Sequence, residues 1–165
     1  FVENVVKDVQ KHLRGKSFDA DRITSIFSTS TQSAINDLVE DMYSVCLGSK
    51  AKIKKAIEVT EGYCKLVKED RVGVSGGGKT TKGHTPPHWH PAGTIFVTLH
   101  GKKTWKIQDR YSEAVEFEVV AEQPSGNVLK CYYLPGEMVH EVTSEKGSIG
   151  LAAYLLTPGQ LLMQL

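Results

Sequence analysis

The chain has 165 residues, of which 40% are hydrophobic and 24% charged, and its formal net charge is +1 with histidine neutral. This length fits one domain with one hydrophobic core. The balanced charge gives no reason to expect a nucleic-acid partner or a charged membrane surface. No apolar run reaches the roughly 18 residues that a membrane-spanning helix needs. The composition is typical of a soluble globular protein.

Three cysteines, Cys46, Cys64 and Cys131, are far apart in the chain. An odd number of cysteines without motif spacing predicts neither a disulfide framework nor a zinc ribbon. This favours a reducing compartment, so we expect a cytoplasmic protein. The chain begins at Phe1 instead of a methionine, which leaves open whether a leader has been removed.

The first 70 residues have the apolar spacing of helices. Gly48 is a natural helix stop, and Gly62 would interrupt the last helix. We expect residues 1–70 to pack on the outside of the strands that follow, with a homodimer contact as the alternative. The expected helices cover residues 1–13, 19–27, 35–46 and 49–66.

From residue 71 the composition changes. Residues 71–87 are rich in glycine and threonine, and we interpret them as a loop. Beyond them apolar and polar residues alternate, as in half-buried strands. Short strands separated by turns favour a barrel or sandwich, so we predict a mostly β domain at 88–165. The expected strands cover residues 94–100, 103–107, 114–121, 128–134, 139–142 and 149–156.

Residues 73–80 match the phosphate-binding P-loop pattern letter for letter. That site needs a buried strand before the glycines and a helix after them, so that the helix N-terminus meets the phosphates. The charged segment 68–71 precedes this match, and Pro86 and Pro87 follow it. We therefore interpret the match as part of the loop and not as a nucleotide site.

His88 and His90 are separated by one residue, so in a strand their side chains point to the same face. Two neighbouring imidazoles can chelate one metal ion, although an isolated pair is more often a surface feature. His140 follows the turn at Pro135 and Gly136 and is the candidate third ligand. We predict that these three histidines form the metal site and catalytic centre. Three imidazoles suit Fe, Zn, Cu, Ni or Mn.

These histidines lie in two motifs that resemble those of the cupin superfamily. The first motif is His-x-His, three residues, Glu, six residues and Gly, and threonine replaces the usual glutamate here. The second is a proline followed by four residues and a metal-binding histidine, matched by Pro135 and His140. The resemblance covers about residues 83–157 and implies a double-stranded β-helix (jelly-roll) barrel. The residues that match the first motif are His88, His90, Thr94 and Gly101.

Within that superfamily the chain looks most like the JmjC-type 2-oxoglutarate oxygenases. Thr85 and Lys103 hold the positions that bind the distal carboxylate of 2-oxoglutarate in those enzymes. A lysine inside a barrel is costly unless it meets an anion, so this role is physically reasonable; a solvated hairpin lysine is the alternative. The resemblance implies a non-haem Fe(II) oxygenase that uses molecular oxygen and 2-oxoglutarate to oxidise a small molecule or a peptide side chain.

His90 departs from this pattern, because those enzymes usually carry a carboxylate there. Three neutral imidazoles also suit the cupin dioxygenases, which bind substrate directly on iron without 2-oxoglutarate. A non-redox cupin, such as an isomerase, a lyase or a ligand sensor, is a further alternative. No general base stands out among the inward positions, which counts against isomerase chemistry.

Strand parity also identifies candidate pocket residues. His100 shares the inward parity but lies about ten residues from His90, roughly 30 Å along a straight strand, so we exclude it as a ligand. Glu141 should face away from its neighbour His140 for the same reason of parity. The expected substrate-pocket residues are Thr94, Phe96, Thr98 and Tyr154.

Overall fold

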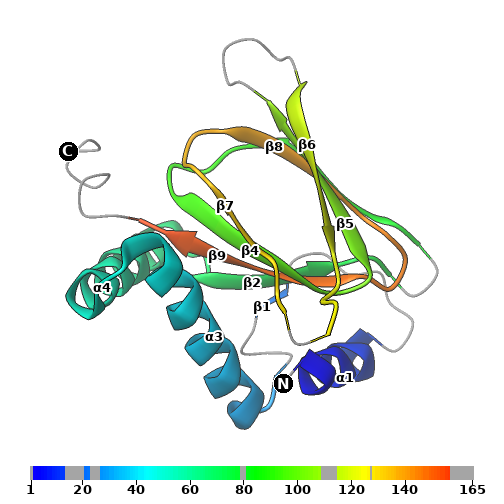
Figure 1. Ribbon diagram of the computed structural model, residues 1–165, viewed down its shortest axis with the longest axis horizontal. Helices are drawn as coiled ribbons and strands as arrows, with labels where there is room; N and C mark the ends of the chain where they lie inside the picture. Colours follow the sequence, from blue (N-terminus) through cyan, green and yellow to red (C-terminus); the bar gives the residue numbers. More distant parts are fainter. Residues whose placement is uncertain are drawn as a thin grey trace.

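The computed structural model in Figure 1 describes residues 2–13, 21–22, 27–78, 81–108, 115–126 and 128–156. The helices in this part of the chain are α1 (Val2–Leu13), α3 (Thr29–Leu47) and α4 (Lys50–Val67). They confirm the helices expected at 1–13, 35–46 and 49–66. The helix expected at 19–27 lies largely outside the described residues, and Asp21–Arg22 within it forms the short strand β1.

Local capping explains where α3 and α4 begin and end. Ser28 and Ser49 cap the two N-termini with their side-chain oxygens. Gly48 ends α3 in the left-handed conformation, at a φ of 66°, where glycine carries no steric cost. The expected interruption at Gly62 is wrong: α4 continues through it to Val67, because a single glycine lowers helix stability without breaking the hydrogen-bond ladder.

The remaining strands form two antiparallel sheets with the orders β1-β2-β9-β4-β7 and β3-β8-β5-β6. From β3 onward the chain passes repeatedly from one sheet to the other, which is the winding of a double-stranded β-helix. The predicted cupin-type fold is therefore confirmed. The strands are β2 (Val72–Gly76), β3 (Gly83–His88), β4 (Gly93–His100), β5 (Lys102–Gln108), β6 (Val115–Glu122), β7 (Cys131–Leu134), β8 (Val139–Ser144) and β9 (Ile149–Leu155).

The interpretation of residues 71–87 as a loop is wrong, because β2 and β3 occupy most of this segment. Its glycines permit close approach of backbones. A Cβ on Gly76 would lie 2.0 Å from the Ser148 carbonyl oxygen, and one on Gly83 would lie 2.5 Å from the Gly76 carbonyl oxygen. Apart from the short strand β1, the sheets therefore begin at Val72 and not at residue 88. The strand β3, and not a helix, follows residues 73–80, which agrees with the exclusion of a nucleotide site. Residues 79 and 80 lie outside the described part of the chain.

The three helices of the described residues lie on one face of the five-stranded sheet (Figure 1). Its outer face and the helices share one hydrophobic core, to which β4 contributes Ile95, Val97 and Leu99. The alternate residues of the same strand face the barrel interior, where Phe96 joins a second core with Trp105. None of the described helices combines the length and apolar character needed to cross a membrane.

Candidate metal centre

His88, His90 and His140 meet at one end of the barrel, as the sequence predicts. His88 ends β3 and pairs in register with His140 on β8, while His90 lies in the segment between β3 and β4. The ring centroids are 4.8 Å apart for His88 and His90, 4.3 Å for His88 and His140, and 5.3 Å for His90 and His140. One nitrogen from each ring lies within 4.8 Å of the other two. This spacing allows three imidazoles to share one ion.

Two of the three histidines hydrogen-bond a backbone carbonyl through Nδ1. His88 Nδ1 lies 2.8 Å from the Pro86 oxygen, and His140 Nδ1 lies 3.0 Å from the Met138 oxygen. A carbonyl can only accept, so each Nδ1 carries the proton and each Nε2 keeps a free lone pair. Ligating histidines in metalloproteins are held in this way. The donor set therefore fits a metal ion.

Burial keeps His90 and His140 uncharged at neutral pH. Burial, with a smaller contribution from positive charge on His88 and His140, lowers the pKa of His90 to about 4. Burial also lowers the pKa of His140 to about 4, against a smaller opposing effect of the Met138 carbonyl. A metal ligand must be deprotonated, so these rings are ready to bind without first losing a proton.

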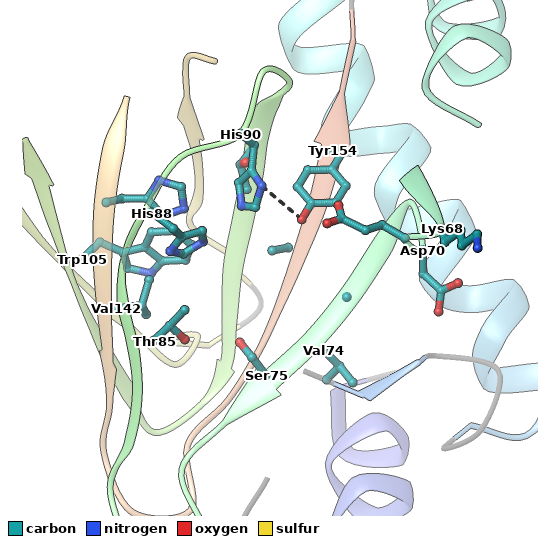
Figure 2. Close-up of a pocket in the computed structure, with 15 residues that line it drawn as sticks. Lys68, Asp70, Val74, Ser75, Thr85, His88, His90, Trp105, Val142 and Tyr154 are labelled. Atoms are coloured by element: carbon teal, nitrogen blue, oxygen red, sulfur yellow. Dashed lines mark hydrogen bonds between the residues drawn. The ribbon is translucent and has the colours of Figure 1, made fainter. Parts of the chain in front are cut away.

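The histidines open onto a cavity of about 360 Å³ (Figure 2), a size that accommodates a small ligand. Thr85, Thr94 and Tyr154 also line it, as do Ser75 and Trp105. Residues 68–70, which follow α4, line it as well, so the helical segment contributes to this site.

Phe96 and Thr98 do not line this cavity, although the sequence predicts them there. Phe96 stacks on Trp105 with ring centroids 3.8 Å apart and on Tyr132 at 5.2 Å, so it packs in the barrel core. Thr98 is only 2% exposed and faces the barrel interior. Inward parity thus identifies the interior face but not how far along a strand the open space extends.

Lys103 lies buried in the barrel and is only 2% exposed, which rules out a solvated hairpin lysine. Its ammonium group donates a hydrogen bond to the hydroxyl of Ser75, which lines the cavity. Gly150 leaves room for the lysine stem, since a Cβ there would lie 3.1 Å from Lys103 Cε. Burial lowers the pKa of Lys103 from 10.5 to about 7. No carboxylate of the described residues forms an ion pair with it.

The surroundings of Lys103 contain further polar atoms without partners. Ser75, Gly150 and Thr98 lie in one row across β2, β9 and β4. Within the described residues, Thr98 Oγ1 and Trp105 Nε1 are buried without a hydrogen-bond partner. Such atoms are costly unless a ligand or water satisfies them. Ser75 is not predicted as a site residue when residues 71–87 are interpreted as a loop. The alternation of Val72, Val74 and Gly76 is the pattern that indicates a strand there.

The remaining polar candidates lie away from the histidine cluster. Glu141 Oε1 is 2.7 Å from His84 Nε2, and Glu141 Oε2 is 4.0 Å from Lys106 Nζ, so this carboxylate faces away from His140 as predicted. His100 is exposed at the end of β4 and belongs to no cluster of metal-ligating groups in the described part of the chain.

No family model and no curated protein matches the sequence. Similar solved structures include the YcfD ribosomal oxygenase from Escherichia coli (16% identity, TM-score 0.42), with 56% of this chain covering 25% of that chain. Another is oxalate decarboxylase from Bacillus subtilis (15% identity, TM-score 0.40). The match covers 57% of this chain and 23% of that chain. A third is a cupin-superfamily protein from Desulfitobacterium hafniense (14% identity, TM-score 0.36). The match covers 54% of this chain and 70% of that chain.

These similar structures are cupin-superfamily proteins. The match spans only a quarter of the length of the Escherichia coli oxygenase. At such low identity it carries no argument about activity, and the chain's own strand order and histidine cluster carry the assignment of the fold. The chain is thus a cupin-type barrel with a three-histidine cluster at one end.

Proposed function

We propose that the chain is a non-haem Fe(II)-dependent oxygenase that uses 2-oxoglutarate to oxidise a small molecule or a peptide side chain. The observation that carries this proposal is the pairing of two features in one barrel. Three imidazoles converge at the cavity, and beside it lies a buried lysine that no carboxylate of the described residues pairs with. A ligand with a metal-binding end and an anionic end would satisfy both.

The metal end of the site is His88, His90 and His140. An iron ion held there would supply oxygen activation, with coordination positions left for ligands. Because an imidazole that binds a metal is uncharged, the three rings would offset none of the ion's charge. This favours anionic ligands at the remaining positions.

The anionic end of the site is Lys103. A carboxylate beside its ammonium would form a charge-assisted hydrogen bond and raise the pKa of the lysine back toward its usual range. The Ser75 hydroxyl already contacts the ammonium. Thr85, on β3, lines the same cavity and is a second hydroxyl donor for the carboxylate.

A second candidate function is favoured by His90. A three-histidine set without a carboxylate suits a dioxygenase that binds its substrate directly on the metal and needs no 2-oxoglutarate. In that case Lys103 would anchor an anionic group of the substrate itself. A non-redox cupin would use the same ligands without consuming oxygen.

One experiment separates these functions. The chain is purified anaerobically, its metal is identified by elemental analysis, and oxygen uptake is measured with and without 2-oxoglutarate. We expect one iron per chain and succinate formation that depends on 2-oxoglutarate. Uptake that needs a substrate but not 2-oxoglutarate would favour the second candidate, and the absence of any uptake would favour a non-redox cupin.

The anchoring role of Lys103 has a matched control on the same hairpin. Lys102 is partly exposed and lies 3.8 Å from Glu145. We expect Lys103→Ala to abolish measurable 2-oxoglutarate binding, since it removes the only charge proposed for the carboxylate, and Lys102→Ala to leave binding unchanged. Equal affinities for the two variants in calorimetry would refute the anchor.

A further inference from the structure

His90 is held differently from the other two histidines. His88 and His140 lie in the paired strands β3 and β8, whereas residues 89–92 belong to no strand. The His90 ring is also held less closely, because its Nδ1 lies 3.5 Å from the Tyr154 hydroxyl. The corresponding distances to backbone carbonyls are 2.8 Å for His88 and 3.0 Å for His140. The position of His90 in the site therefore depends on the contacts of its backbone.

The β7–β8 turn, residues 135–138, contacts the backbone of this segment at two points. The Glu137 N–H donates a hydrogen bond to the His90 carbonyl oxygen at 2.7 Å. Gly136 packs so closely that a Cβ on it would lie 2.3 Å from the Pro91 carbonyl oxygen. The turn and the segment therefore touch backbone to backbone, with no room for a side chain at position 136.

Glu137 makes its contact in a strained conformation. Its φ is 68°, in the left-handed region that residues other than glycine seldom adopt. Such a conformation persists only where the surroundings hold it, and it is found most often at functional sites. Here consecutive residues of the turn reach two of the histidines. The Glu137 N–H bonds the His90 backbone, and the Met138 carbonyl accepts from His140 Nδ1 at 3.0 Å.

The turn completes the spacing of the three rings. Strand pairing sets His88 opposite His140, and the separation of two residues in the sequence limits the distance from His88 to His90. The distance between the rings of His90 and His140 is the longest of the three, at 5.3 Å, and the turn bridges it. We propose that Gly136 and Glu137 are positioning residues that set this distance and thereby the affinity for a metal ion. The proposal rests on the proposed metal-binding function.

The first test needs no metal. In the NMR spectrum of the metal-free chain, a scalar coupling between the amide nitrogen of residue 137 and the His90 carbonyl carbon reports their hydrogen bond directly. Glu137→Gly and Glu137→Val form a matched pair, because both remove the carboxylate but only glycine adopts a φ of 68° freely. We expect the coupling in the wild type and in Glu137→Gly, and its loss in Glu137→Val. A wild type without the coupling would overturn the proposal.

The second test measures the affinity for Co(II), with its visible spectrum as a readout of the ligand geometry. We expect Glu137→Val to lower the affinity about tenfold or more, the usual effect of losing a group that orients a ligand. The spectrum should change as His90 moves, and glycine at position 137 should rescue both the affinity and the spectrum. Equal losses in the two variants would show that the carboxylate matters and the backbone does not, and would refute the proposal.

Gly136→Ala tests the packing contact. The added Cβ displaces the Pro91 carbonyl, so we expect a similar loss of Co(II) affinity and the same spectral change. Gly76→Ala is the matched control, because a Cβ there would lie 2.0 Å from the Ser148 carbonyl oxygen. This clash is of the same kind but lies beside Gly83, at the end of β3 remote from the histidines. An equal loss in the control would show a general loosening of the barrel and refute the positioning role.

Circular dichroism verifies that each variant is folded, and the pair at position 137 decides if an alanine variant does not fold. Failure of the proposed function is visible separately. A wild-type chain that binds no metal would refute that function, and the coupling would then decide alone whether the turn holds His90. A wild type that binds Co(II) tightly, with Glu137→Val and Gly136→Ala binding it equally well, would leave the metal site intact and refute the positioning role.

Discussion

The two faces of the five-stranded sheet are built from the same strands but are chemically opposite. The outer face of β4 and β9 presents Ile95, Val97 and Leu151, which are fully buried under the helices. The inner face presents Thr94 and Ala152, which line the cavity, and Gly150, which leaves room for the Lys103 side chain. Alternation in the strands thus separates stability from function. The outer core offsets the cost of burying a lysine, the unpaired Thr98 hydroxyl and the unpaired Trp105 N–H inside the barrel.

The largest stability effect is expected on the outer face. Leu151 is 2% exposed between helices and sheet. Leu151→Ala should lower the free energy of unfolding by about 2–5 kcal/mol, because it leaves a cavity in a packed core. Metal affinity should be retained, since the side chain points away from the histidines. Chemical denaturation and a metal titration check both parts; loss of metal binding in a folded variant would show that the two faces are coupled.

Inside the barrel, replacement of Lys103 on β5 should raise the free energy of unfolding instead of lowering it. Lys103→Met removes a buried charge, so the ligand-free protein should become more stable at pH 7, on the order of a few kcal/mol. The pKa of Lys103 is about 7 in the folded chain and 10.5 in the unfolded chain. Between these values the unfolded state binds more protons, so wild-type stability rises with pH.

The gain from Lys103→Met should therefore be largest near pH 7 and below and vanish above about pH 10.5. Thermal denaturation at several pH values checks this trend. A variant that is less stable than the wild type at pH 7 would show that the lysine has an anionic partner in the free protein.

A smaller effect is expected at Gly150, on β9 of the five-stranded sheet. A Cβ there would lie 3.0 Å from the Val97 carbonyl oxygen and 3.1 Å from Lys103 Cε. Gly150→Ala should displace the lysine stem and weaken 2-oxoglutarate binding several-fold, with a stability loss of about 1 kcal/mol. Calorimetry checks the affinity, and an unchanged value would place the anchor elsewhere.

The smallest effect is expected at Glu141, whose carboxylate faces outward on β8. Glu141→Gln changes the hydrogen bond with His84 and removes a partly exposed ion pair with Lys106. The stability change should stay within about 0.5 kcal/mol, and the metal affinity should not change. A marked loss of metal in this variant would identify Glu141 as a ligand after all.

Periodicity made most of the fold predictable from the sequence. The strands after residue 88 and the described long helices follow patterns that depend on neighbouring residues alone. The segment 71–87 was misread because glycine and proline usually mark loops. Gly76 and Gly83 instead allow backbones to approach each other, and this close approach depends on Ser148, which is far along the chain.

The histidine cluster was predictable for a different reason. His88 and His90 have local spacing, and the turn before His140 placed the third ring at the head of a strand. The residues that surround the histidines and Lys103 were not predictable in this way. Ser75 near Lys103 and Tyr154 near His90 come from segments that only the folded barrel brings together, and no local pattern marks an unpaired hydroxyl such as that of Thr98.

The most direct measurement is an anaerobic Fe(II) titration of the wild type and His140→Ala, with bound metal counted per chain. We predict one ion per wild-type chain, and a loss of affinity of about 100-fold or more in the variant, because one of three ligands is removed while the fold is kept. Circular dichroism verifies that the variant is folded. Equal binding by the two proteins, or no binding by the wild type, would contradict a metal centre at these three histidines.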